Sequence, residues 1–141
     1  SFVPKPWTPY QWDGLAPVKT LKQRFAMLNT AFKKDARIKL ITESLKETEL
    51  QAILARGNRK VGLALGAAFT KGRPFKKALQ DAGFDAAGYA HRQLEPGQIL
   101  PWSHLVMGVS EAYLRKERER SLQGLATPMC FEGCHRCGVC K

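Results

Sequence analysis

The spacing of hydrophobic residues predicts a mainly helical chain. Over residues 17–34 the apolar positions recur every three or four residues, the period of one helix face: Val18, Leu21, Phe25, Leu28 and Phe32. Lysines and arginines occupy the other face. Further helices are expected at residues 44–57, 59–71, 74–83, 85–91 and 111–123.

The residues that begin and end these segments support the prediction. Ser44 followed by Glu47 is the pattern of a capping box, in which two side chains satisfy free backbone N–H groups at a helix start. Gly57 is a typical helix stop. The helix between them is expected to bury Leu45, Leu50, Ile53 and Leu54. The next helix is rich in glycine and alanine, which permits close packing against a neighbour.

Two segments depart from the helical period. Residues 37–42, with the sequence RIKLIT, alternate polar and apolar side chains and predict a short strand. Residues 1–16 contain prolines interleaved with aromatic residues, which favours extended chain and turns. The expected fold class is therefore α+β and mostly helical.

The composition describes a single domain with a strong positive charge. The 141 residues are enough to bury a core. The sequence contains no run of about 18 apolar residues, so it predicts no membrane span. The chain has 23 basic and 12 acidic residues, a net charge of +11. Such a charge favours polyanionic partners, RNA among them, because binding phosphates releases their counterions. A basic surface that only contacts solvent is an equally good interpretation, since the basic residues are scattered along the chain.

The four cysteines are the clearest chemical signal in the sequence. Cys130, Cys134, Cys137 and Cys140 follow 129 residues without a cysteine. Disulfides between such near neighbours would close very small loops and add little stability, so a metal site in a reducing cytoplasm is expected instead. Compact thiolate spacing is typical of a 4Fe–4S cluster, whereas zinc sites usually use two pairs separated by a longer loop. Zinc and free thiols stay open as alternatives.

The first three cysteines also match a catalytic motif. Cys130, Cys134 and Cys137 have the Cys-x3-Cys-x2-Cys spacing of radical S-adenosylmethionine (SAM) enzymes. In that motif three thiolates leave one iron open for the cofactor, and a barrel that follows in the sequence covers it. Here Cys140 supplies a fourth thiolate and a single residue follows it. We therefore expect an auxiliary cluster and not the catalytic one.

Distant parts of the chain together resemble a known family. Residues 1–12, SFVPKPWTPYQW, resemble the FVPKPxTPFQW segment of cobalamin-binding-type radical SAM iron–sulfur proteins. Residues 49–59 resemble the ExxLARGDRR helix of that family. Residues 100–110 and 114–117, followed by the cysteines, resemble its LPWDHIxxGVSxxFLxxE…TxxCxxxxCxxCGVC ending. The gap between the first two cysteines is shorter here than in the family pattern, a departure that concerns the placement of one ligand.

The resemblance implies a fold, an activity class and a division of the chain. It implies the carboxy-terminal third of a radical SAM enzyme whose catalytic cysteines lie upstream, so that this piece alone has no radical chemistry. Residues 1–42 would end a partial (β/α) barrel, residues 43–124 would form a helical extension, and residues 125–141 would form a cysteine tail.

The resemblance also implies cofactors and partners. The tail would hold a 4Fe–4S cluster, or zinc, and SAM would bind the full-length parent. The rest of that polypeptide is the implied partner, with RNA as a further one, in the cytoplasm and away from membranes. The alternative function is a basic nucleic-acid-binding module with a structural zinc site.

Two histidines and an aromatic group are weaker candidates. His104 is a candidate ligand or proton carrier, although a histidine beside an aromatic residue is more often structural. His135 lies between cysteines and is expected to be a solvated neighbour of the metal. Trp7, Tyr10 and Trp12 are candidates for stacking on bases, although aromatic residues in proline-rich loops more often pack against protein.

A cluster of positive charge surrounds the helix stop at Gly57. Arg56, Arg59 and Lys60 are candidates for holding phosphates. The more common role for charges at such a position is to complement the partial charge of a helix end. The second role is the favoured interpretation.

Overall fold

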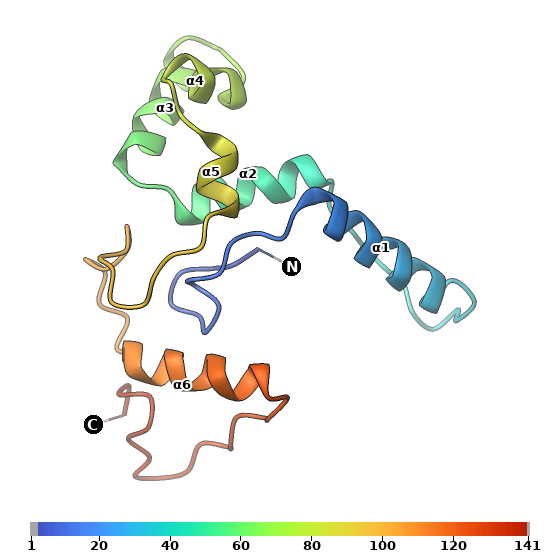
Figure 1. The fold of residues 1–141 in the computed structure, drawn as a ribbon, viewed down its shortest axis with the longest axis vertical. Coiled ribbons are helices and arrows are strands. Elements are labelled where there is room, and N and C mark those ends of the chain that lie inside the picture. The colour runs from blue at the N-terminus through green and yellow to red at the C-terminus, as the bar shows by residue number, and fades with distance from the viewer. Residues whose placement is uncertain (1–2, 141) are drawn as a thin grey trace.

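The structure is a computed structural model that describes residues 3–140, in which six helices are joined by turns and extended chain (Figure 1). The helices are α1 Val18–Phe32, α2 Leu45–Arg56, α3 Arg59–Thr70, α4 Phe75–Asp81, α5 Ala86–His91 and α6 Glu111–Leu122. Each lies within two residues of a segment that the hydrophobic pattern predicted. The predicted helices are therefore confirmed.

The predicted strand at residues 37–42 is wrong, and so are the α+β class and the partial (β/α) barrel, because residues 3–140 contain no strand. The segment instead turns at the end of α1 and returns as extended chain. The Asp35 carboxylate accepts hydrogen bonds from the backbone and guanidinium of Arg37, and the Asp35 carbonyl accepts from Ile38 N–H at 3.1 Å. An alternating pattern forms a strand only when a neighbour completes its hydrogen-bond ladder, and no described segment does so.

Side-chain caps determine where four of the helices begin. The capping box is confirmed: Ser44 Oγ accepts from Glu47 N–H at 3.2 Å, and Glu47 Oε2 accepts from Ser44 N–H at 3.1 Å. At the starts of α3, α5 and α6, the side chains of Asn58, Asp85 and Ser110 each accept one backbone N–H, without the second bond of a capping box. Each cap satisfies an N–H group that the helix itself leaves free.

Two hydrophobic clusters connect the helices. The first joins the N-terminal chain to α1 through α5: Val3, Leu15, Leu21, Ala52, Ile53, Val61, Ala64, Leu79 and Ala90. The second joins the N-terminal turn to the loop before α6 and to α6 itself: Trp12, Leu94, Leu100, Trp102 and Leu114. Whether the chain divides at residues 42 and 124 stays a prediction.

The buried faces of α2 and α3 are set by their neighbours. Of the four apolar residues expected to be buried on α2, Ile53 is fully buried, whereas Leu54 is 46% exposed. Since α5 packs against α2, the small Ala52 and the long Arg56 occupy the contact instead. On α3 the alanines face α4, while Gly62 and Gly66 have open space beside them.

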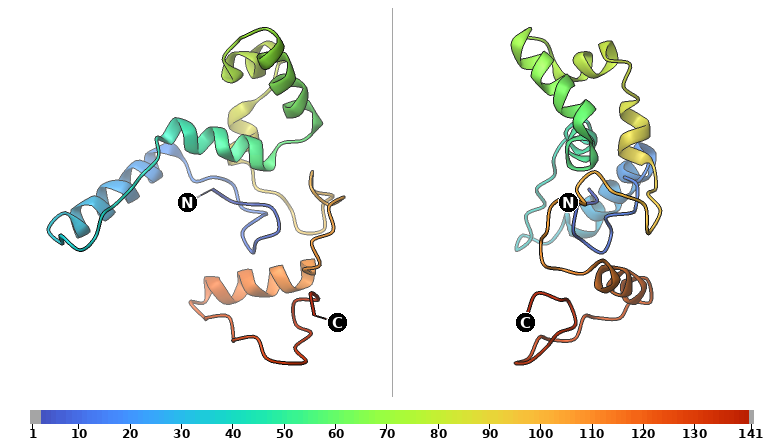
Figure 2. Two further views of the ribbon diagram at one scale, coloured as in Figure 1. Left: turned by 180° about the vertical axis from the view of Figure 1, so that it is seen from behind. Right: turned by 90° about the vertical axis from the view of Figure 1, so that its left-hand side faces the viewer.

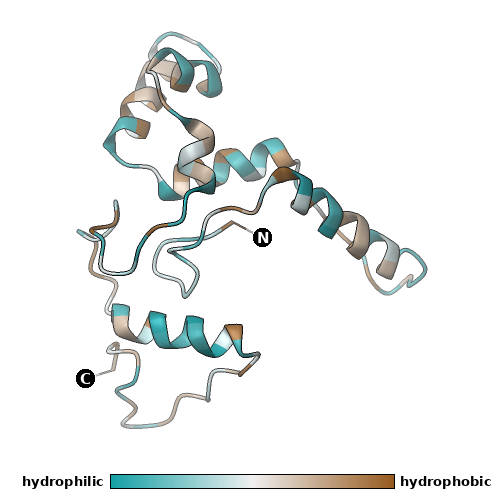
Figure 3. Ribbon diagram, viewed as in Figure 1, coloured by the Kyte–Doolittle hydropathy of each residue, from teal (hydrophilic) through white to brown (hydrophobic). Residues whose placement is uncertain are grey.

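The elements are arranged around the N-terminal chain. Figures 1 and 2 show α1 projecting to one side and α6 lying on the other side of the N-terminal segment from α2–α5. Much of the surface of α6 is polar (Figure 3). Within residues 3–140, no helix combines the length and the apolar character that a membrane span needs.

Candidate metal centre

Segments from the two ends of the chain meet in the second hydrophobic cluster. The buried Gln11 Oε1 accepts hydrogen bonds from Trp102 Nε1 and from the backbone of Trp7, both at 2.9 Å. Leu94 N–H donates to the Trp12 carbonyl at 2.7 Å. Trp12 is 1% exposed, so it packs inside the protein and offers no face for a base.

Helix α6 is held against this cluster by polar contacts as well as by Leu114. Arg118 forms an ion pair with Asp13 at 2.7 Å. The Tyr10 hydroxyl donates to Ser121 Oγ at 2.8 Å. These contacts join residues more than a hundred positions apart in the sequence, and they give the tail that follows α6 a defined support.

The cysteine tail returns along α6 to the start of that helix (Figure 1). At the near end, Leu125 N–H donates to the Arg120 carbonyl at 2.9 Å, and the Thr127 hydroxyl bonds the buried Glu117. At the far end, Ser110 N–H donates to the Cys137 carbonyl at 2.8 Å. Ser110 is the N-cap of α6. The loop that contains the cysteines is therefore attached near both the end and the start of this helix.

Arg136 organises the inside of this loop. Its Nε donates to Cys134 Sγ at 3.1 Å, and its Nη2 donates to the carbonyls of Pro128 and Met129. The guanidinium also lies over the Phe131 ring, 5.6 Å from the centroid. One side chain therefore joins the first half of the loop to the second.

The same contact changes the acidity of the thiols. The Arg136 hydrogen bond lowers the pKa of Cys134 to about 7, so that much of this thiol is ionised at neutral pH. The hydrogen bond with Cys134 raises the pKa of Cys130, since two neighbouring thiols do not ionise together easily. Thiolates, and not thiols, are the ligands of metals.

The structure brings some of the four predicted ligands together. Cys134 is buried, Cys137 is half-buried, and Cys130 and Cys140 are exposed; all four are free thiols. Cys130 lies beside Cys134 and is influenced by the charge of Cys140. Among residues 3–140, however, no three candidate ligands are close enough together to hold a metal ion.

The donor set nevertheless fits the predicted metal. Four cysteines are a donor set that can hold a 4Fe–4S cluster or a zinc ion. One of them, Cys134, is already acidic enough for much of it to be ionised at neutral pH. Gly133 and Gly138 have φ values of +76° and +87°, a left-handed conformation that glycine adopts without strain. These glycines provide turns between the cysteines. We expect the loop to close around the metal only when the metal binds.

The two histidines lie outside any group of ligands. His135 Nδ1 is 3.1 Å from the Cys140 carbonyl, a contact within the loop. His104 is exposed and forms no hydrogen bond with the described residues. Neither histidine lies with the thiols in a set that could hold a metal in this structure.

Arg56 has a structural role. It is fully buried, and its guanidinium donates to the carbonyls of Tyr89, Ala90 and Arg92 at 3.2, 2.8 and 2.7 Å. These carbonyls lie at the C-terminal end of α5. The positive charge of Arg56 therefore complements the end of α5, and not the end of α2, to which Arg56 belongs. Arg59 and Lys60 are exposed.

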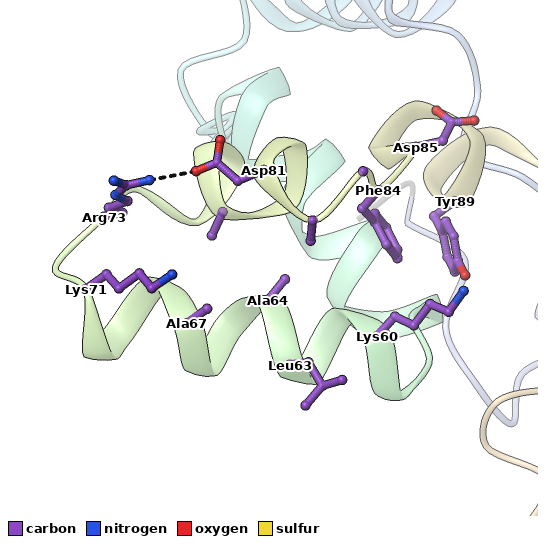
Figure 4. Close-up of a pocket in the computed structure, with 13 residues that line it drawn as sticks. Lys60, Leu63, Ala64, Ala67, Lys71, Arg73, Asp81, Phe84, Asp85 and Tyr89 are labelled. Atoms are coloured by element: carbon purple, nitrogen blue, oxygen red, sulfur yellow. Dashed lines mark hydrogen bonds and ion pairs between the residues drawn. The ribbon is translucent and has the colours of Figure 1, made fainter.

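A pocket of about 670 Å³ lies between α3 and α4 (Figure 4). Alanines form its floor, and Lys60 and Lys71 lie at its ends. Asp81 is already paired with Arg73 and Lys77, and Asp85 caps α5. Both carboxylates of the pocket are therefore already engaged in contacts within the protein.

The sequence prediction of the metal site missed Arg136. Its position two residues after Cys134, inside a compact cysteine motif, is the signal that could have found it, because a cation at that spacing reaches a neighbouring thiolate. The roles of Ser110 and Glu117 in attaching the tail depend on its return path, which no local pattern shows.

Comparison of the chain with protein-family models, with curated proteins and with solved structures finds no match. The function is therefore inferred from the site itself and from the resemblance of the sequence motifs.

Proposed function

We propose that residues 130–140 bind a metal centre through Cys130, Cys134, Cys137 and Cys140, and that this centre is a 4Fe–4S cluster. The observation that carries the proposal is the Arg136–Cys134 contact, which favours a thiolate at neutral pH inside a loop attached to both ends of α6. A loop that ionises one of its four thiols in advance lowers the proton cost of binding a metal.

Each part of the loop has a separate task in this proposal. The Ser110–Cys137 hydrogen bond fixes the returning end of the loop, and Arg136 keeps Cys134 ionised. A 4Fe–4S cluster with four thiolate ligands supplies electron transfer or structural stability, and it leaves no iron open to a substrate.

We also propose that the chain is part of a cytoplasmic radical SAM iron–sulfur enzyme whose catalytic cluster is held by other residues. Support comes from the motif resemblance and from where its residues lie. Trp12, Trp102 and Leu114 come from separate matching segments and pack in one cluster, next to the helix that carries the cysteine loop. In such an enzyme SAM would bind the parent protein and not these four thiolates.

Anaerobic reconstitution with iron and sulfide tests the metal assignment. The protein is expected to take up about four irons per chain and to absorb broadly near about 400 nm. The same reconstitution with zinc also present distinguishes the two metals. One zinc per chain with no iron would replace the cluster by a structural zinc site, and uptake of neither metal would refute a metal centre.

Replacing Arg136 with glutamine is expected to weaken metal binding most at low pH. Without the guanidinium the pKa of Cys134 returns from about 7 toward its ordinary value of 9, so protons compete better for the thiolate. The affinity should fall about tenfold or more at pH 7, and the loss should shrink to about twofold by about pH 9, where Cys134 is ionised in the original protein and about half ionised in the variant. Competition with a chelator at several pH values measures this.

Lys116→Gln is the matched control, because it removes an exposed positive charge from α6 that forms no hydrogen bond with any of the four cysteines. It should leave the affinity unchanged at every pH. An Arg136→Gln loss of equal size at pH 7 and pH 9 would show that Arg136 only shapes the loop and does not act through ionisation.

A further inference from the structure

A basic arm projects from the body of the protein. We use this name for residues 18–42, which comprise α1 and the chain that returns from it. The arm contains seven basic residues and one acidic residue, a net charge of +6 against +11 for the whole chain. The basic residues are Lys19, Lys22, Arg24, Lys33, Lys34, Arg37 and Lys39, all of them exposed.

The charges of the arm are almost entirely unpaired. Arg37 forms an ion pair with Asp35, whereas the other six basic side chains form no ion pair with the residues that the structure describes. The acidic residue that follows the arm, Glu43, accepts a hydrogen bond from Gln51 of α2 at 2.7 Å. This carboxylate is thus engaged with the body of the protein.

The shape of the arm suits a long anionic partner. Figures 1 and 2 show α1 extending away from the other helices, and the basic side chains of this helix are exposed. The 15 residues of α1 span about 22 Å. This length covers about six base pairs of a duplex, since phosphates of one strand follow every 3.4 Å or so along its axis.

The apolar face of α1 is partly covered by the chain's own residues, which argues against a membrane as the partner. Leu21 is buried in the first hydrophobic cluster. Phe25 and Leu28 are half-buried and share a pocket with Leu40 and Ile41 of the returning chain. A helix that binds a lipid surface inserts its apolar face into the bilayer, whereas here Leu21 is already buried and Phe25 and Leu28 are half-covered by the chain itself.

The other basic region is less suited to a polyanion. Around the pocket between α3 and α4, Arg73 and Lys77 both form ion pairs with Asp81, which offsets one of their two charges. Arg56 is buried, and Arg92 lies over the Tyr89 ring at 4.2 Å. Fewer free charges are left there than on the arm.

We propose that the basic arm binds the phosphodiester backbone of nucleic acid. The contact is with phosphates and not with stacked bases, because the exposed residues of the arm include seven lysines and arginines and no aromatic residue. The site lies apart from the cysteine loop, so metal-free protein is expected to bind as well as reconstituted protein.

Fluorescence anisotropy with labelled RNA and DNA duplexes of about 20 base pairs, over a range of salt concentrations, tests the proposal. The expected slope of log K against log salt is about −4 to −5, from five or so phosphate contacts. For the triple variant Lys19→Gln, Lys22→Gln, Arg24→Gln, the slope should be less negative by about two to three. Its affinity at low salt should fall at least about tenfold. Glutamine preserves the helix, since its helix propensity is close to that of lysine and arginine.

The matched control is Lys60→Gln, Lys71→Gln, Lys76→Gln, which removes the same charge from exposed positions in α3, after α3 and in α4. It should lose less than about threefold in affinity and less than about one unit of slope. Equal losses in the two triple variants would mean that net charge alone attracts nucleic acid and would overturn the proposal. It would also be overturned if neither duplex bound, or if phosphatidylserine vesicles bound the arm more tightly than either duplex.

Discussion

Replacing Arg56 with methionine is expected to destabilise the protein by about 3 kcal/mol, a factor of about 150 in the folding equilibrium. Methionine preserves much of the volume of the buried side chain but removes every donor. The carbonyls of Tyr89, Ala90 and Arg92 would then lie at the end of α5 without their present partner. Urea unfolding followed by far-ultraviolet circular dichroism measures the change.

Arg59→Met serves as the control, because it removes the same kind of charge from an exposed position three residues away. Its effect should stay within about 0.5 kcal/mol. Arg56→Lys preserves the charge, but one ammonium group replaces the planar fork that reaches three carbonyls, so an intermediate loss is expected. A loss below about 1 kcal/mol for Arg56→Met would show that the contact between α2 and α5 does not depend on the guanidinium.

The helices could be predicted from the sequence because their signals are local. The Ser44–Glu47 capping box lies within four consecutive residues, and the structure contains both of its hydrogen bonds. Asn58 and Asp85 likewise act on backbone groups two or three positions away. A feature that depends on neighbours in sequence can be recognised without knowing the fold.

Local sequence patterns did not predict the structure correctly at residues 37–42 and at Arg56. The alternation at 37–42 is a genuine pattern, but a strand also needs a partner, and Asp35 offers the backbone a turn instead. Arg56 looks like a surface charge beside Gly57, yet it is buried because α5, more than thirty residues later, packs against α2. Neither outcome is encoded within a short window of sequence.

The candidate metal site combines both situations. The four cysteines and their glycines are a local motif, so the ligands and the kind of metal could be proposed from spacing alone. The support for the loop comes from contacts with Ser110 and Glu117 of the α6 region, and these require the tail to turn back. The residue that affects ligand chemistry most directly, Arg136, was inside the motif but was not recognised without its geometry.

Truncation after Gly124 is expected to abolish metal binding completely while leaving the helices intact. The shortened chain lacks Cys130, Cys134, Cys137 and Cys140, so its iron content should fall from about four per chain to none. Neither hydrophobic cluster contains a residue of the tail, and the last helix ends at Leu122, so the far-ultraviolet helical signal should be nearly unchanged. A small loss of stability is expected near Glu117, because this buried carboxylate loses its bond to Thr127. Metal-free full-length protein is the control, and its helical signal should match that of the truncated chain. Unfolding of the truncated chain would mean that the tail supports α6, and not the reverse.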